Sequence, residues 1–121
     1  MPHVTVQMIE EELDGVEEAL IAGLTDAVTS VYGEWVRPNV AVALHGVPRR
    51  RWGITGDTAA IVTLGMRERA FERVADLPER LIPALTDALA AAAGERIRAH
   101  VTVTLVGIPA GREGVGGAIP A

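Results

Sequence analysis

The chain contains no cysteine, and only 3% of its 121 residues are aromatic. The absence of cysteine excludes a disulfide framework, a thiolate nucleophile and a zinc–thiolate site. With so few aromatic residues, the core must consist mainly of Val, Leu, Ile and Ala. The sequence shows no secretion signal and no apolar run near the roughly 18 residues that a membrane span needs. We therefore expect one cytoplasmic domain with its own core and no membrane partner.

Acidic residues outnumber basic residues by 16 to 11, so the formal net charge is −5. This balance argues against nucleic acid as a partner. The arginines are nevertheless clustered, first at residues 49–51 and then at Arg67, Arg69 and Arg73. Such clusters in an acidic protein favour a small anion over a polyanion. The three histidines show no HxH or HxxxH spacing, so we expect no metal site.

Proline at position 2 is the main candidate for chemistry. If Met1 is removed, Pro2 carries a free secondary amine, whereas inside a chain its nitrogen is a non-basic amide. An α-amino group titrates near pH 7.7–8.0, roughly, and apolar surroundings lower that pKa. Such a base suits proton transfer beside a carbonyl. The alternative is that Pro2 is an ordinary second residue without a role.

Hydrophobic periodicity predicts an alternation of strands and helices. Apolar residues at three- and four-residue steps predict helices from Leu13 to Val31 and from Leu77 to Ala92, ended by glycines. Pro83 predicts a kink or a late start in the second helix. Residues 67–76 read as loop with some helix. The predicted strands are residues 3–9, 39–45, 59–66 and 100–106.

An internal repeat organises these elements. When the sequence is shifted by 61 residues, residues 20–56 fall on 81–117 without a gap, and 17 of these 37 residues are identical. We infer a duplicated β-α-β unit, with repeats of about 2–57 and 58–117 in a single domain spanning 1–121. This predicts an α+β fold, in which a four-stranded sheet carries two helices on one face. Strands such as 40–44 read as apolar on both sides, which predicts self-association.

The Met-Pro start and the duplicated β-α-β unit resemble the tautomerase superfamily. That superfamily includes 4-oxalocrotonate tautomerase, macrophage migration inhibitory factor and the 3-chloroacrylate dehalogenases. Residues 52–56, WGITG, are similar to an aromatic-Gly-Ile-Gly-Gly segment of 4-oxalocrotonate tautomerase. The segments LTDA, GDT and HVTVTLVGIPA are most similar to the cis-3-chloroacrylate dehalogenase type. The resemblance covers nearly the whole chain and implies a homotrimer, as is typical of members with two units per chain.

The resemblance also implies roles for particular residues. Pro2 matches the amino-terminal catalytic proline, and the matching strand start of the second unit holds Ala59 or Ala60, so one such amine per chain is expected. Arg67 and Arg69 occupy the neighbourhood of two carboxylate-binding arginines. Arg73 lies nearby, and the spacing leaves open which of the three arginines bind the carboxylate. The alternative is that these arginines belong to a solvated loop, with Glu68 and Glu72 as their partners.

Two further residues are candidates. Trp52 is either a wall of the substrate site or part of a subunit interface. Glu113 falls near the acid that activates water in the dehalogenases. Other positions depart from the superfamily pattern, because a helix histidine, a strand tyrosine and two arginines are replaced by Val28, Thr104, Glu12 and Ala41.

The best-supported function is therefore a cofactor-independent tautomerase of a small 2-oxo or 2-hydroxydienoic acid. One alternative is a hydratase or dehalogenase of a short unsaturated carboxylic acid. Another is a non-catalytic trimeric binding protein that retains the proline.

Overall fold

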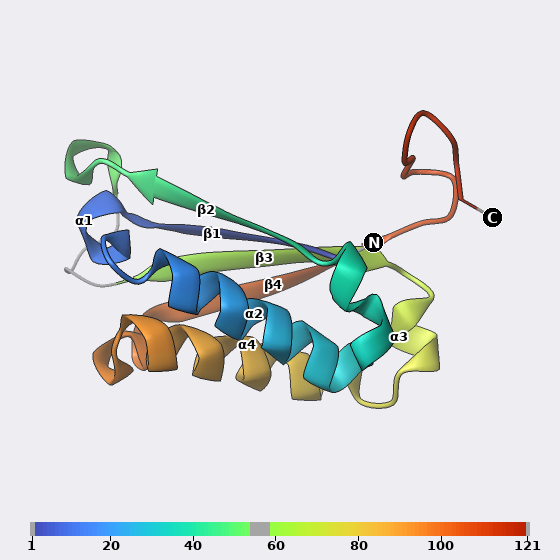
Figure 1. Ribbon diagram of the computed structural model, residues 1–121, viewed down its shortest axis with the longest axis horizontal. Coiled ribbons are helices and arrows are strands. Elements are labelled where there is room, and N and C mark those ends of the chain that lie inside the picture. The colour runs from blue at the N-terminus through green and yellow to red at the C-terminus, as the bar shows by residue number, and fades with distance from the viewer. Residues whose placement is uncertain (1, 54–58, 121) are drawn as a thin grey trace.

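The computed structural model describes residues 2–53 and 59–120 and shows a four-stranded sheet with both long helices on one side (Figure 1). The strands are β1 (His3–Ile9), β2 (Ala41–Val47), β3 (Ala60–Arg67) and β4 (Val101–Ile108). The helices are α1 (Glu10–Leu13), α2 (Glu17–Tyr32), α3 (Ala70–Arg73) and α4 (Leu77–Ala93). Three 3-10 turns are η1 (Glu34–Asn39), η2 (Arg49–Arg51) and η3 (Glu95–His100). The predicted α+β fold is confirmed.

The sheet has the order β2-β1-β3-β4, so two parallel pairs meet through the antiparallel pair of β1 and β3. The register pairs His3 with Ala41 and Ile61 with Thr102. Because Ala41 and Thr102 hold the same position in the repeat, Ala60 is the counterpart of the proline before His3. The repeat boundary at 57/58 stays a prediction, since residues 54–58 lie outside the described residues.

The first predicted helix is interrupted. α1 ends at Leu13, and the chain turns through Gly15, whose φ of 85° suits glycine, before α2 starts at Glu17. α4 starts at Leu77 and continues past Pro83, so the predicted late start is wrong. β2 and β4 begin later than predicted because η1 and η3 occupy the residues before them. The hydrophobic periodicity does not predict η1 or η3.

The core lies between the sheet and the two long helices. Alternate side chains of β1 and β3 point to this side, as the pleat of a strand requires. They meet the leucine stripes of α2 and α4, which confirms the predicted apolar faces of both helices. Each fully buried leucine contributes on the order of 1.5–3 kcal/mol of hydrophobic stabilisation. Buried members of this core include Val4, Val6, Met8, Leu20, Leu24, Val28, Val62, Leu64, Leu81, Leu85 and Leu89.

The opposite face of the sheet carries a mixture of short, polar and apolar side chains, among them Val106 at 44% exposure. One row across it consists of Ala43, Thr5, Thr63 and Thr104, and Ala41 is also exposed. The prediction of strands that are apolar on both sides therefore holds for the alanines of β2 and for Ile61 and Val106, but not for the threonine row. In Figure 1, α2 and α4 lie on the other side of the sheet, and no helix among residues 2–53 and 59–120 covers this face.

Candidate active site

Pro2 lies at the end of the sheet where β1 and β2 begin. It is buried, and its carbonyl oxygen accepts a hydrogen bond from the backbone nitrogen of Ala41 at 3.1 Å. The start of β2 therefore holds Pro2 in place. Pro2 lines a cavity of about 610 Å³, here called the Pro2 cavity, to which α2, η1, α3 and the C-terminal segment contribute.

Three arginines line the Pro2 cavity with the proline. Arg67 is the last residue of β3, Arg69 is the N-cap of α3 and Arg73 is the last residue of α3. They lie near Pro2 because the antiparallel pairing brings the end of β3 beside the start of β1. Within residues 2–53 and 59–120, none of the three guanidinium groups forms an ion pair, not even with the nearby glutamates of their own loop. They are therefore available to bind a carboxylate in a fork geometry.

An aromatic wall faces this cluster. Tyr32 and Trp35 line the cavity, with ring centroids 5.4 Å apart and an interplanar angle of 59°. The indole of Trp35 is 69% exposed, which is unusual for a side chain this apolar. Sequence reasoning missed both residues. The signal was present, because the second repeat has Ala93 and Arg96 at these positions in a chain with two tryptophans and one tyrosine.

Comparison with known proteins supports the resemblance. A family model described as Tautomerase enzyme matches residues 2–60. The structure of Pt0534 inactivated by 2-oxo-3-pentynoate has a TM-score of 0.83 at 23% identity, covering 97% of this chain and 94% of that one. A fused 4-OT wild type symmetric trimer gives 0.81 at 23% identity, with the same coverage. A macrophage migration inhibitory factor-like protein from Entamoeba histolytica gives 0.76 at 11% identity, covering 98% and 97%.

Residues 2–60 thus match the tautomerase family model, and the chain as a whole shares the fold of these solved structures. The family model spans the first β-α-β unit together with the start of β3. The solved structures extend the likeness in fold over both units. No curated protein matches the chain.

Trp52 lies far from the Pro2 cavity within one chain. It follows η2, beyond the end of β2, and β2 runs parallel to β1, so Trp52 is at the opposite end of the sheet from Pro2. It is not among the residues that line the Pro2 cavity. A single chain therefore does not provide Trp52 as a wall of this site. Residues 54–56 of the WGITG segment lie outside the described residues.

Glu113 lines a neighbouring cavity of about 220 Å³. Arg67, Arg69 and Pro120 line both cavities, whereas Pro2 lines only the larger one. The two cavities thus share a wall that contains two guanidinium groups. Glu113 and Pro2 therefore line different cavities that share Arg67 and Arg69.

At the opposite end of the sheet, the residues that correspond to the Pro2 site by the repeat are different. Ala60 replaces Pro2, the acidic α1 replaces the arginine-bearing α3, and Arg96 replaces Trp35. The Arg96 guanidinium lies 3.4 Å from the carboxylate of Glu12, whose side chain is only 22% exposed. An ion pair thus occupies the position where the other end has an aromatic wall, so the duplication leaves one candidate site per chain.

Two negative findings apply to the described residues alone. Residues 2–53 and 59–120 contain no group of three or more His, Asp or Glu side chains that could hold a metal ion. Over the same ranges, none of the helices combines the length and the apolar character needed to cross a membrane.

Proposed function

We propose that this chain is a cofactor-independent tautomerase of a small 2-oxo or 2-hydroxydienoic acid, with Pro2 as the acid–base group. One observation carries the proposal. A buried Pro2, three arginines without ion-pair partners in the described chain, and an aromatic wall all line one cavity. That combination offers a base, an anion clamp and an apolar surface to a substrate with a carboxylate at one end.

The reaction uses Pro2 as a free amine after removal of Met1. Pro2 takes the proton from the enol hydroxyl and returns it to carbon, which completes the keto form. The arginines bind the carboxylate and stabilise charge that develops on the neighbouring oxygen. We expect burial and these cations to lower the pKa of the amine below the ordinary α-amino range, because both disfavour a further positive charge.

Replacing Pro2 tests the proposal. Pro2→Ala keeps a terminal amine but displaces it, so ketonisation of phenylenolpyruvate should slow by about 10²-fold or more. The wild-type rate should rise with pH as the amine loses its proton. Intact mass spectrometry of the same preparation shows whether Met1 has been removed. An unchanged rate in Pro2→Ala would leave a non-catalytic trimeric binding protein as the better description.

Covalent labelling supplies a second, independent test. The sequence contains neither lysine nor cysteine, so the terminal amine is the only amine nucleophile in the chain. We expect 2-oxo-3-pentynoate, the compound that inactivates Pt0534, to add once per chain at Pro2. Peptide mapping that finds the adduct only on a histidine would contradict the proposed role of Pro2.

The position of Glu113 favours one alternative, a hydratase or dehalogenase of a short unsaturated acid. In that reaction Glu113 activates water across the shared arginine wall, and a cationic Pro2 donates the proton. Glu113→Gln separates the two functions, because hydration of an acetylenic acid should be lost while ketonisation of phenylenolpyruvate continues.

A further inference from the structure

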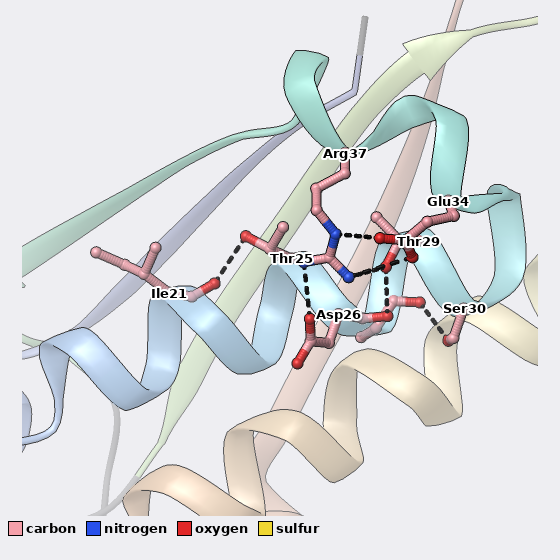
Figure 2. A network of polar contacts seen from close by, with 8 residues as sticks. Ile21, Thr25, Asp26, Thr29, Ser30, Glu34 and Arg37 are labelled. Atoms are coloured by element: carbon pink, nitrogen blue, oxygen red, sulfur yellow. Dashed lines mark hydrogen bonds and ion pairs between the residues drawn. The ribbon is translucent and has the colours of Figure 1, made fainter.

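Arg37 ties η1 to α2 through a fork of hydrogen bonds (Figure 2). Its Nε donates to the carboxylate of Glu34, and its two terminal nitrogens donate to Asp26 at 2.9 Å and to the hydroxyl of Thr29 at 3.1 Å. The bond from Arg37 holds the pKa of Glu34 below its ordinary value of 4.5. Glu34 begins η1, and Asp26 and Thr29 lie in α2. The guanidinium therefore links the end of η1 to its start and links η1 to α2.

Trp35 sits inside this closed turn. It lies between Glu34 and Arg37 in the sequence, and its neighbour Val36 is buried in the core at 2% exposure. A methyl group placed at Gly33, where φ is 127°, would lie 2.5 Å from the indole nitrogen, so the ring rests against the glycine backbone. The backbone is thus held on both sides of Trp35, and its indole lines the Pro2 cavity.

The second repeat contains the same arrangement. Arg98 donates to Glu95 and Asp87, and each residue lies 61 positions after its counterpart in the first repeat. The turn held there, η3, presents Arg96 to Glu12 at the end of the sheet without the proline. The ionic cluster is therefore common to both units, while the side chain that it presents differs.

We propose that Arg37 is a positioning residue that holds Trp35 as the wall of the Pro2 cavity. The inference rests on the proposed function of that cavity. The groups of the cluster are solvent-exposed, with the Asp26 and Glu34 side chains 66% and 73% exposed, and such pairs contribute little to stability. Their fork geometry fixes direction instead, which a point charge such as lysine does not reproduce.

Kinetics of matched variants test this role. In Arg37→Met, KM for phenylenolpyruvate should rise by about three- to tenfold, the range expected when a substrate-positioning wall loosens, with kcat within about twofold. Arg98→Met removes the equivalent cluster at the other end and should leave both constants unchanged. Arg37→Lys keeps the charge and should share the defect. Equal losses in the Arg37→Met and Arg98→Met proteins, or full activity in Arg37→Lys, would overturn the proposal.

Time-resolved fluorescence anisotropy measures the local mobility of Trp35 independently of activity. In a Trp52→Phe background, Trp35 is the only tryptophan. Arg37→Met should speed the local anisotropy decay of Trp35, and Arg98→Met should not. An unchanged decay with Arg37→Met would refute the positioning role even if the wild type is an active tautomerase. An inactive wild type would refute the proposed function, and the decay would then decide the positioning role alone.

Discussion

Replacing Arg67 by alanine should weaken binding of a carboxylate substrate while leaving the fold intact. Arg67 ends β3, is half-buried and lines the Pro2 cavity. It forms no ion pair with any described residue, so its removal leaves no carboxylate without a partner. We therefore expect the free energy of unfolding to change by no more than about 0.5 kcal/mol, as for most surface substitutions.

The loss in binding follows from the strength of the bonds removed. A hydrogen bond to a charged group contributes about 1.5–3 kcal/mol, and about 1.4 kcal/mol corresponds to a factor of ten. KM for phenylenolpyruvate should thus rise by about 10- to 100-fold in Arg67→Ala. Arg69 and Arg73 are more exposed, so solvent screens their charges, and their alanine variants should show smaller increases of about three- to tenfold.

The assay compares the acid with its methyl ester. The ester lacks the anionic charge, so its KM should change much less in each variant. Arg50→Ala is the matched control, because it removes the same charge from an exposed position in η2 at the other end of the sheet. Equal effects on acid and ester, or an equal effect of Arg50→Ala, would show that the arginines do not bind the carboxylate.

Three further outcomes follow from the structure. Hydrogen bonds from arginine lower the pKa of Glu34 and Glu95 in the folded state. Below about pH 4.5 the unfolded chain therefore binds more protons than the folded chain, and the free energy of unfolding falls as the pH is lowered. This fall, measured by urea denaturation, should be less steep in the double variant Glu34→Gln/Glu95→Gln than in wild type. Gly33→Ala and Gly94→Ala should both destabilise, at φ of 127° and 112°, but only Gly33→Ala should raise KM for phenylenolpyruvate, since only there does the added methyl group meet Trp35. Light scattering should give three chains per particle, and a monomer would contradict the predicted trimer.

The sequence by itself determined the architecture. Leucine stripes at helical spacing and the 61-residue repeat predicted two β-α-β units and the helices on one face, because periodicity and duplication are properties of the chain alone. The same pattern could not reveal η1 and η3. These turns depend on the anchors Val36 and Ile97 in the core and on arginine clusters that exist only once α2 and α4 have formed.

The candidate site was predicted in part. Pro2, Arg67, Arg69 and Arg73 were all singled out from the sequence, and the structure brings them to one cavity. The sequence left Trp52 either as a wall of this site or at a subunit interface; within one chain the parallel pairing of β1 and β2 carries it to the other end of the sheet, and the interface stays a prediction.

Only the tertiary structure decided which residues of the two units come together at the Pro2 end of the sheet. The antiparallel pairing of β1 with β3 places Pro2 beside the arginines and brings Trp35 to the same cavity. At the other end, the same pairing leaves Ala60 near acidic α1, and Arg96 pairs with Glu12. The two repeats have similar sequences, so this difference arises from residues far apart in the chain that meet only when the sheet forms.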